Sequence, residues 1–255
     1  MLYCGTVAEG GDESRAGLAM ADALMDSVKA EDASLADAVR VWRLMHLNSM
    51  SWREWRSLAA GEIAAVREEI ESADGLPEQL EQRAKKAIGA DRRHNSLLAA
   101  HARRNLAISR LRCLAAFDLS PRVPFAKRGR PVTEDVYEKV RNAFSLIGAS
   151  GLLGPLPPRA ALARAYGLLL LSQWFDAESA ALEALKADAG DQFAMYVAAE
   201  AALQRGAFVA ALKYFRDAQQ IAIMDPDLRD FIDEFRVLHE AQAIAAAEAD
   251  AQPAA

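Results

Sequence analysis

Apolar residues recur along this chain at steps of three and four, the spacing of an amphipathic helix. A first helix is predicted from residue 12 or 13 to about Lys29. A second is predicted from Ser34, a residue type that favours the N-cap position. The apolar face of this second helix holds Leu35, Val39, Trp42 and Met45.

The clearest helix start follows at residues 51–54, where Ser51 and Glu54 have the spacing of a capping box. Met50 is placed to pack on Trp55 as a hydrophobic staple. We expect one amphipathic helix from here to the break at residues 73–79. Its apolar positions are Trp52, Trp55, Ala59, Ile63, Val66 and Ile70.

Prolines and glycines mark the remaining helix boundaries. Pro77 suits the first turn of a helix that Gly89 is placed to end, and a longer helix follows from about Arg92 to Phe117. Residues 119–131 include three prolines and cannot continue that helix. Thr133 is placed to cap a further helix, which ends at the Gly- and Pro-rich segment 148–158.

Beyond Pro158 the chain repeats its pattern at a constant offset of 34 along the sequence. Each copy is expected to be two helices joined by a tight turn, near Ser172 in the first copy and Gly206 in the second. Small residues at fixed positions let paired helices approach closely, and an aromatic after the turn fills the space between units. The matched positions are Trp174 and Phe208, Ala177 and Ala211, Ala181 and Phe215, Ala184 and Ala218, and Ala165 and Ala199.

This pattern resembles the tetratricopeptide repeat (TPR) family over residues 159–226. The second copy carries the stronger likeness, with Ala199, Gly206, Phe208, Ala211, Phe215 and Ala218 at the family's positions. The first copy departs from the pattern. It has Ser172 in place of the turn glycine, Ala181 in place of an aromatic, and Ala189 in place of the usual proline. The alternative is a generic Ala-rich helical hairpin.

The resulting expectation is an all-α protein in two parts. Residues 1–117 form an N-terminal helical bundle with a basic last helix, and residues 118–132 a Pro-rich basic linker. Residues 133–246 form a short TPR-like array with a capping helix, and residues 247–255 a disordered tail.

The resemblance implies that the first helices of successive units line a groove for an extended or helical peptide. By position, the groove residues are Arg159, Leu162, Tyr166, Leu169, Phe193, Tyr196, Glu200 and Gln204. The family's clamp for a C-terminal carboxylate uses Lys and Asn where this chain has Tyr166 and Glu200, so that ligand is not expected. The alternative, in which the tyrosines pack against a neighbouring helix, stays open.

The composition and the first residues of the chain favour a cytoplasmic protein. No apolar run is long enough to span a membrane, and the N-terminus lacks the regions of a signal peptide. Cys4 lacks the hydrophobic lead-in of a lipidation site. Cys4 and Cys113 have no motif spacing, which favours reduced thiols and a cytoplasmic location. The Ala-rich composition is typical of a bacterial protein.

Motifs for catalysis are missing from the sequence. It has no HExxH, paired CxxC, GxSxG, Walker loop or GxGxxG. His94 and His101 share a helix face, but two ligands make a poor metal site, and solvent-facing histidines are the favoured interpretation. Glu68, Glu69 and Glu71 are interpreted as a solvated helix face. We therefore expect no enzyme, no metal and no cofactor.

Charge is distributed unevenly along the chain. Residues 83–130 contain thirteen Lys and Arg against Asp91 and Asp118, whereas both flanks are acidic. The sequence around Arg128 and Arg130 resembles the core of an AT-hook, which lies in the minor groove of DNA. The favoured use is contact with the protein's own acidic flanks or with an acidic partner. The basic residues are Arg92, Arg93, Arg103, Arg104, Arg110, Lys127, Arg128 and Arg130.

The favoured function is a non-enzymatic adaptor, scaffold or chaperone that binds another protein in the repeat groove. Secretion-type chaperones and assembly scaffolds are analogous repeat proteins, but type III secretion chaperones usually lack so long an N-terminal part. The alternative is a nucleic-acid-binding regulator that uses residues 83–130, with the repeats as an effector or dimer surface. Self-association is left open. The tryptophans at 42, 52 and 55 are interpreted as a small N-terminal core rather than a ligand site.

Overall fold

The computed structural model describes residues 11–28, 33–50, 54–55, 57–118 and 133–221, together with Arg229 and Ile244. These parts are almost wholly helical and contain no strand, which confirms the prediction of an all-α protein. The expected linker at 118–132, capping helix up to 246 and tail at 247–255 fall almost entirely outside them. None of the described helices is long and apolar enough to cross a membrane.

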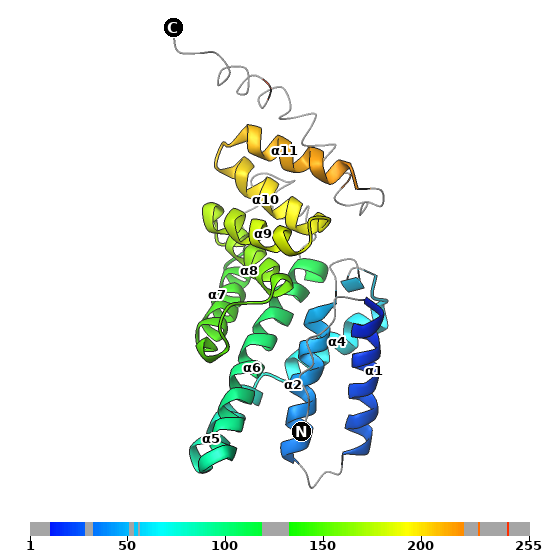
Figure 1. The fold of residues 1–255 in the computed structure, drawn as a ribbon, viewed down its shortest axis with the longest axis vertical. Helices are drawn as coiled ribbons and strands as arrows, with labels where there is room; N and C mark the ends of the chain where they lie inside the picture. Colours follow the sequence, from blue (N-terminus) through cyan, green and yellow to red (C-terminus); the bar gives the residue numbers. More distant parts are fainter. Residues whose placement is uncertain are drawn as a thin grey trace. The chain divides into compact units, whose positions relative to one another are not determined.

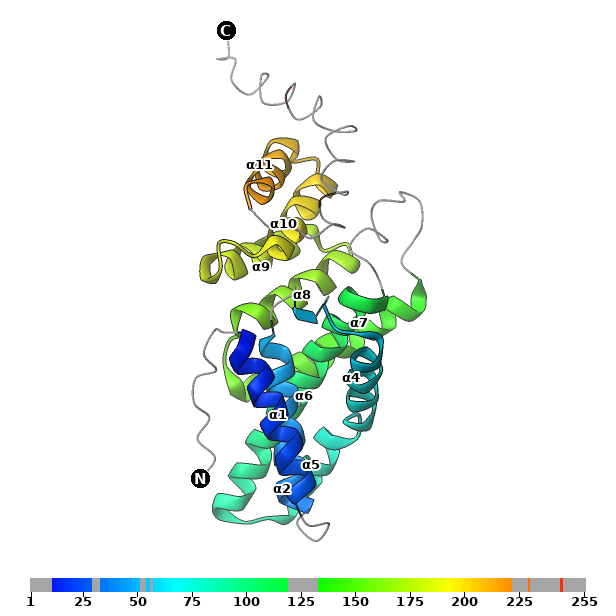
Figure 2. The ribbon, with the colours of Figure 1, turned by 90° about the vertical axis from the view of Figure 1, so that its right-hand side faces the viewer.

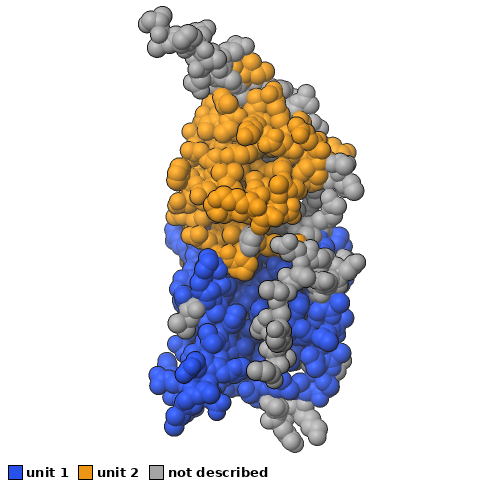
Figure 3. Space-filling view, viewed as in Figure 1, with its two compact units in different colours: residues 1–113, 141–155 blue, residues 114–140, 156–255 orange. Residues whose placement is uncertain are grey.

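The chain divides into two compact units, coloured separately in Figure 3. Unit 1 comprises residues 1–113 and 141–155, and unit 2 comprises residues 114–140 and 156–255. Helix α7 (Glu134–Gly148) contributes to both.

Unit 1 is a bundle built around one long helix. Helices α1 (Gly11–Ser27) and α2 (Ala33–Ser49) pack together, and α2 packs on α6 (Gly89–Cys113). Helix α5 (Leu76–Lys86) folds back along α6 as a hairpin, while α4 (Ala60–Ser72) makes a smaller contact with α6 (Figures 1 and 2). Trp55 is fully buried in this unit and donates its indole N–H to the carbonyl of Leu47 at 3.0 Å.

The expected continuous helix from Ser51 to Ile70 is interrupted in the structure. Glu54 and Trp55 are helical, but the chain turns near Ser57 and α4 begins only at Ala60. The carboxylate of Glu62 accepts the backbone N–H of Ala59 at 2.7 Å, so the restart has its own capping contact. Residues 51–53 lie outside the described parts.

The C-terminal end of α2 is held by a buried arginine on α6. Arg112 is 5% exposed and donates to the carbonyls of Asn48 at 2.8 Å and Met50 at 2.6 Å, with a longer contact of 3.4 Å to Leu47. Its guanidinium also lies 5.3 Å from the ring centroid of Trp55. The last carbonyls of a helix lack hydrogen-bond donors within the helix and carry partial negative charge. The Arg112 guanidinium supplies both the missing donors and a compensating positive charge.

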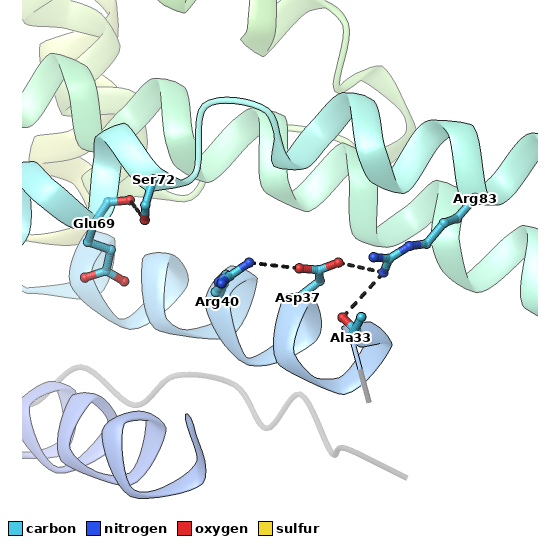
Figure 4. Close-up of polar contacts among 6 residues, drawn as sticks. All are labelled: Ala33, Asp37, Arg40, Glu69, Ser72 and Arg83. Atoms are coloured by element: carbon cyan, nitrogen blue, oxygen red, sulfur yellow. Dashed lines mark hydrogen bonds and ion pairs between the residues drawn. The ribbon is translucent and has the colours of Figure 1, made fainter. Parts of the chain in front are cut away.

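A second buried polar group joins α2 to α5. The Asp37 carboxylate is almost fully buried and lies 2.6 Å from Nη1 of Arg83 and 3.2 Å from Nη1 of Arg40 (Figure 4). The contact with Arg40 is a directed hydrogen bond. The contact with Arg83 is an ion pair, and Oδ2 of Asp37 accepts no directed hydrogen bond from any residue that the structure describes. Two cations thus compensate the burial of one carboxylate.

Unit 2 contains two successive helix pairs. Helix α8 (Pro158–Leu170) packs on α9 (Trp174–Ala187), α9 on α10 (Gln192–Gln204), and α10 on α11 (Phe208–Gln219), as Figure 1 shows. The offset of 34 holds for the helix starts themselves, from Pro158 to Gln192 and from Trp174 to Phe208.

Residues at matched positions of the two pairs have matched burial. Trp174 and Phe208 each open the second helix of their pair and are both half-buried. The other four matched pairs are buried throughout: Ala165 and Ala199, Ala177 and Ala211, Ala181 and Phe215, Ala184 and Ala218. Small side chains at the helix contacts allow the close packing that the sequence pattern predicts.

Candidate functional site

The expected groove residues lie on α8 and α10, and most of them are buried. Arg159 is half-buried and Gln204 is exposed. The remaining six are no more than 4% exposed: Leu162, Tyr166, Leu169, Phe193, Tyr196 and Glu200. In this conformation these six side chains are buried, as in the alternative interpretation, which the sequence left open, that the tyrosines pack against a neighbouring helix.

Three of these buried residues, Tyr166, Phe193 and Tyr196, are aromatic and lie close together, with the polar side chain of Glu200 near them. The Phe193 ring lies 5.5 Å from the Tyr166 ring and 5.8 Å from the Tyr196 ring, centroid to centroid. Glu200 accepts a hydrogen bond from Gln204 at 2.6 Å. Burial raises the pKa of both tyrosines, and the nearby Glu200 and Tyr166 raise the pKa of Tyr196 further. Both phenols are therefore neutral, as a packed core requires.

A different part of unit 2 is exposed and apolar. Phe175 at the start of α9 is 70% exposed, and Val209 at the start of α11 is 43% exposed. They occupy equivalent positions of the two copies, directly after the matched aromatics Trp174 and Phe208. Arg205, in the turn before α11, holds its guanidinium 5.6 Å from the Phe175 ring centroid. We call Phe175, Arg205 and Val209 the edge surface.

A buried carboxylate fixes Arg205 in that position. Glu178 on α9 is 8% exposed, forms an ion pair with Arg205, and accepts the Tyr214 hydroxyl at 3.2 Å. Burial raises the pKa of Tyr214, and the Glu178 carboxylate adds to that shift. The ion pair with Glu178 therefore holds the Arg205 guanidinium near the ring of Phe175, which lies one helical turn before Glu178 on α9.

The edge surface was not assigned from the sequence. A usable signal was present, since an apolar residue directly follows the matched aromatic in both copies, at Phe175 and Val209. The contact of Arg205 with Glu178 had no such signal, because the two residues are 27 positions apart on different elements.

The basic residues of the middle segment that the structure describes differ in exposure and in partners. Arg103 pairs with Glu81 and Arg110 with Asp74, so acidic residues of the same unit neutralise both. Arg92 and Arg93 are exposed. Lys127, Arg128 and Arg130, which include the AT-hook-like sequence, lie outside the described residues.

Arg104 is buried and donates hydrogen bonds to backbone carbonyls, so its guanidinium is not on the surface where a nucleic-acid phosphate could reach it. It donates to the carbonyl of Gly154, and more weakly to those of Pro155 at 3.3 Å and Leu153 at 3.4 Å. Burial lowers the pKa of Arg104. His101, one turn earlier, has its pKa lowered by burial and then by the charge of Arg104. His101 is thus partly buried rather than solvent-facing.

Several carboxylates of unit 1 form ion pairs with arginines of the same unit. Glu69 is half-buried, and its Oε2 lies 2.8 Å from Nε of Arg43, whereas Glu68 and Glu71 are exposed as expected. Burial raises the pKa of Glu69, with Arg43 opposing the shift. Within the described residues no group of three or more His, Cys, Asp or Glu side chains could hold a metal ion.

Comparison of the chain with protein-family models, with curated proteins and with solved structures finds no match in any of the three.

Proposed function

We propose that this protein is a non-enzymatic adaptor or scaffold that binds a partner protein through the helical pairs of unit 2. The observation that carries the proposal is the edge surface, where an aromatic ring that is 70% exposed lies under an anchored guanidinium. Aromatic and arginine side chains contribute most of the binding free energy in many protein interfaces. A preset arginine also loses little conformational entropy on binding.

The partner is proposed to be an amphipathic segment with an apolar side for Phe175 and Val209. The two residues occupy the same position in successive helix pairs, so they offer the same contact twice. A partner with repeated apolar positions would engage both. A chaperone role would use the same surface, and a cytoplasmic, bacterial setting remains part of the proposal.

Affinity capture from the native cell with the full chain as bait tests the proposal. We expect at least one partner that is retained by the wild-type chain and lost when Phe175→Ser is combined with Val209→Ser. The melting temperature should stay within about 2 °C, because both side chains are on the surface. Leu97→Ser is a matched control, since Leu97 is also 43% exposed but belongs to unit 1.

The buried aromatic residues on α8 and α10, Tyr166, Phe193 and Tyr196, test the competing hypothesis that the partner binds in the groove. Tyr196→Ala should lower the melting temperature because the side chain is 2% exposed. If Tyr196→Ala instead abolished capture at unchanged melting temperature, while the edge variant bound normally, the binding site would be the groove. If neither variant changed capture, unit 2 would not be the binding unit.

A further inference from the structure

The basic residues on α5 and α6 separate into those with partners inside unit 1 and those without. Arg83, Arg103 and Arg110 pair with carboxylates of the unit, and Arg104 and Arg112 bind backbone carbonyls. What remains exposed, with no ion pair to any residue that the structure describes, is Lys85, Lys86, Arg92 and Arg93.

Lys85 and Lys86 end α5, and Arg92 and Arg93 lie in the first turns of α6, so the four cations lie at the end of the α5–α6 hairpin where the two helices join. Figures 1 and 2 show this hairpin. Helix α5 ends at Lys86 and α6 begins at Gly89, whose positive φ of 62° makes the tight reversal. Between the two helices lies Ile88, which at 89% has the greatest exposure of any large apolar side chain in the described parts. We call Lys85, Lys86, Ile88, Arg92 and Arg93 the basic tip.

The stability of unit 1 accounts for only part of this composition. Lysines in the last turn of α5 complement its dipole, but Arg92 and Arg93 stand near the start of α6, where the positive end of the helix disfavours cations. Asp91 is the one acidic residue between positions 82 and 102. Ile88 buries almost none of its surface in the fold. The tip is therefore better explained by a contact outside the chain.

We propose that the basic tip docks on the surface of a bilayer that contains anionic phospholipids. Each Lys or Arg held near an anionic leaflet contributes about 1 kcal/mol of attraction, so four clustered cations favour binding although the whole chain has a net charge of −6. An aliphatic side chain at the centre of the cluster adds burial among the outer parts of the acyl chains. The contact is peripheral and reversible, and it is independent of partner binding on unit 2.

The exposed isoleucine distinguishes a bilayer from the other anionic partners. A nucleic acid would use the four cations, but it could take up Ile88 only by distorting its base stack, and residues 82–102 contain no Phe, Tyr or Trp to stack on bases. An acidic protein would have to recognise a tight turn of few residues, whereas a stable protein interface usually buries about 800 Å² per partner. A bilayer needs no complementary shape.

Co-sedimentation of the full chain with phospholipid vesicles tests the proposal. At low salt we expect the protein to pellet with vesicles of phosphatidylcholine mixed with phosphatidylglycerol, and not with phosphatidylcholine alone. Reversal of two charges by Arg92→Glu with Arg93→Glu should weaken the partition coefficient by roughly tenfold or more. Ile88→Ser, which keeps every charge, should weaken it by roughly three- to tenfold.

Lys186→Glu with Lys213→Glu is the matched control, because both lysines are exposed residues of unit 2 and the net charge changes equally. This control should retain at least half of the wild-type partition coefficient. The proposal is overturned if the wild-type chain stays in the supernatant at low salt, or if the tip and control variants lose binding equally. It is also overturned if Ile88→Ser has no effect while a short DNA duplex or polyglutamate binds the tip as tightly as the vesicles do.

Discussion

Ser172 and Gly206, at equivalent positions of the two helix pairs, adopt the same left-handed backbone conformation, with φ of 59° and 77°. Each follows the first helix of its pair. In both turns the next residue donates its N–H five positions back, from Gln173 to the Leu168 carbonyl and from Ala207 to the Ala202 carbonyl, both at 2.9 Å. This is the Schellman arrangement. The two helix pairs are thus closed by the same backbone device, although only one has the glycine.

Ser172→Gly should stabilise unit 2. Ser172 is the only non-glycine residue with positive φ in the described parts, and that conformation costs a residue with a Cβ roughly 1 kcal/mol. We expect a gain of about 0.5–1 kcal/mol, since the added freedom of glycine in the unfolded chain offsets part of it. The measurement is amide hydrogen exchange of α8 to α11.

Gly206→Ala is the reciprocal test. A Cβ built on Gly206 meets no atom within 4 Å, so a loss of about 1 kcal/mol would come from the backbone conformation alone. If neither Ser172→Gly nor Gly206→Ala changed the stability of unit 2, the conclusion that both turns share a left-handed conformation would be contradicted.

Tyr166→Phe should raise the stability of unit 2 rather than lower it. The Tyr166 side chain is fully buried, and its hydroxyl has no hydrogen-bond partner among the residues that the structure describes. Its removal relieves a desolvation cost of about 1 kcal/mol while the ring contact with Phe193 stays. Tyr214→Phe is the matched control and should lower stability, because that hydroxyl donates to Glu178. A loss for Tyr166→Phe as large as for Tyr214→Phe would indicate a bound partner for the Tyr166 hydroxyl.

Arg112→Leu should destabilise unit 1 by about 2–4 kcal/mol, because the buried carbonyls at the end of α2 lose their donor. Arg112→Lys should recover only part of this loss, since a single ammonium cannot reproduce the forked contacts. Urea unfolding followed by circular dichroism measures both. Arg92→Leu, an exposed arginine on the same helix, should change stability by less than about 0.5 kcal/mol.

Stability should fall as the pH drops below about 6.5, through His46 and His101. Burial lowers the pKa of both side chains in the folded protein. The unfolded chain therefore takes up protons first, and folding free energy is lost between the unfolded pKa and the lower folded values. His46 is closely packed, since a Cβ on Gly17 would lie 2.3 Å from its Nδ1.

Melting temperatures between about pH 7.5 and 5 check this prediction. The combined variant His46→Gln and His101→Gln should show a smaller decline than the wild-type chain. His94→Gln, which alters an exposed histidine on α6, should follow the wild-type profile. An unchanged decline in the double variant would assign the pH dependence to other groups.

Helix content and the repeat spacing could be predicted because they depend on local features. The steps of three and four set the helical faces, and the matched alanines fix the offset between the helix pairs. The break near Ser57 escaped prediction, since the periodic pattern through Ala59 and Ile63 continues across it. There a buried Trp55 and the Glu62 contact with Ala59 prevail over the local pattern.

By itself the sequence determined an all-α chain and a doubled helix pair, because residue spacing and turn chemistry act over a few positions. Tertiary structure alone decided which polar and aromatic groups are accessible. It buried Tyr166 and Tyr196, left Phe175 exposed under Arg205, and paired Arg103 and Arg110 while leaving the basic tip free of ion pairs to described residues. Burial and ion pairing depend on which distant helices meet, and no local pattern encodes that.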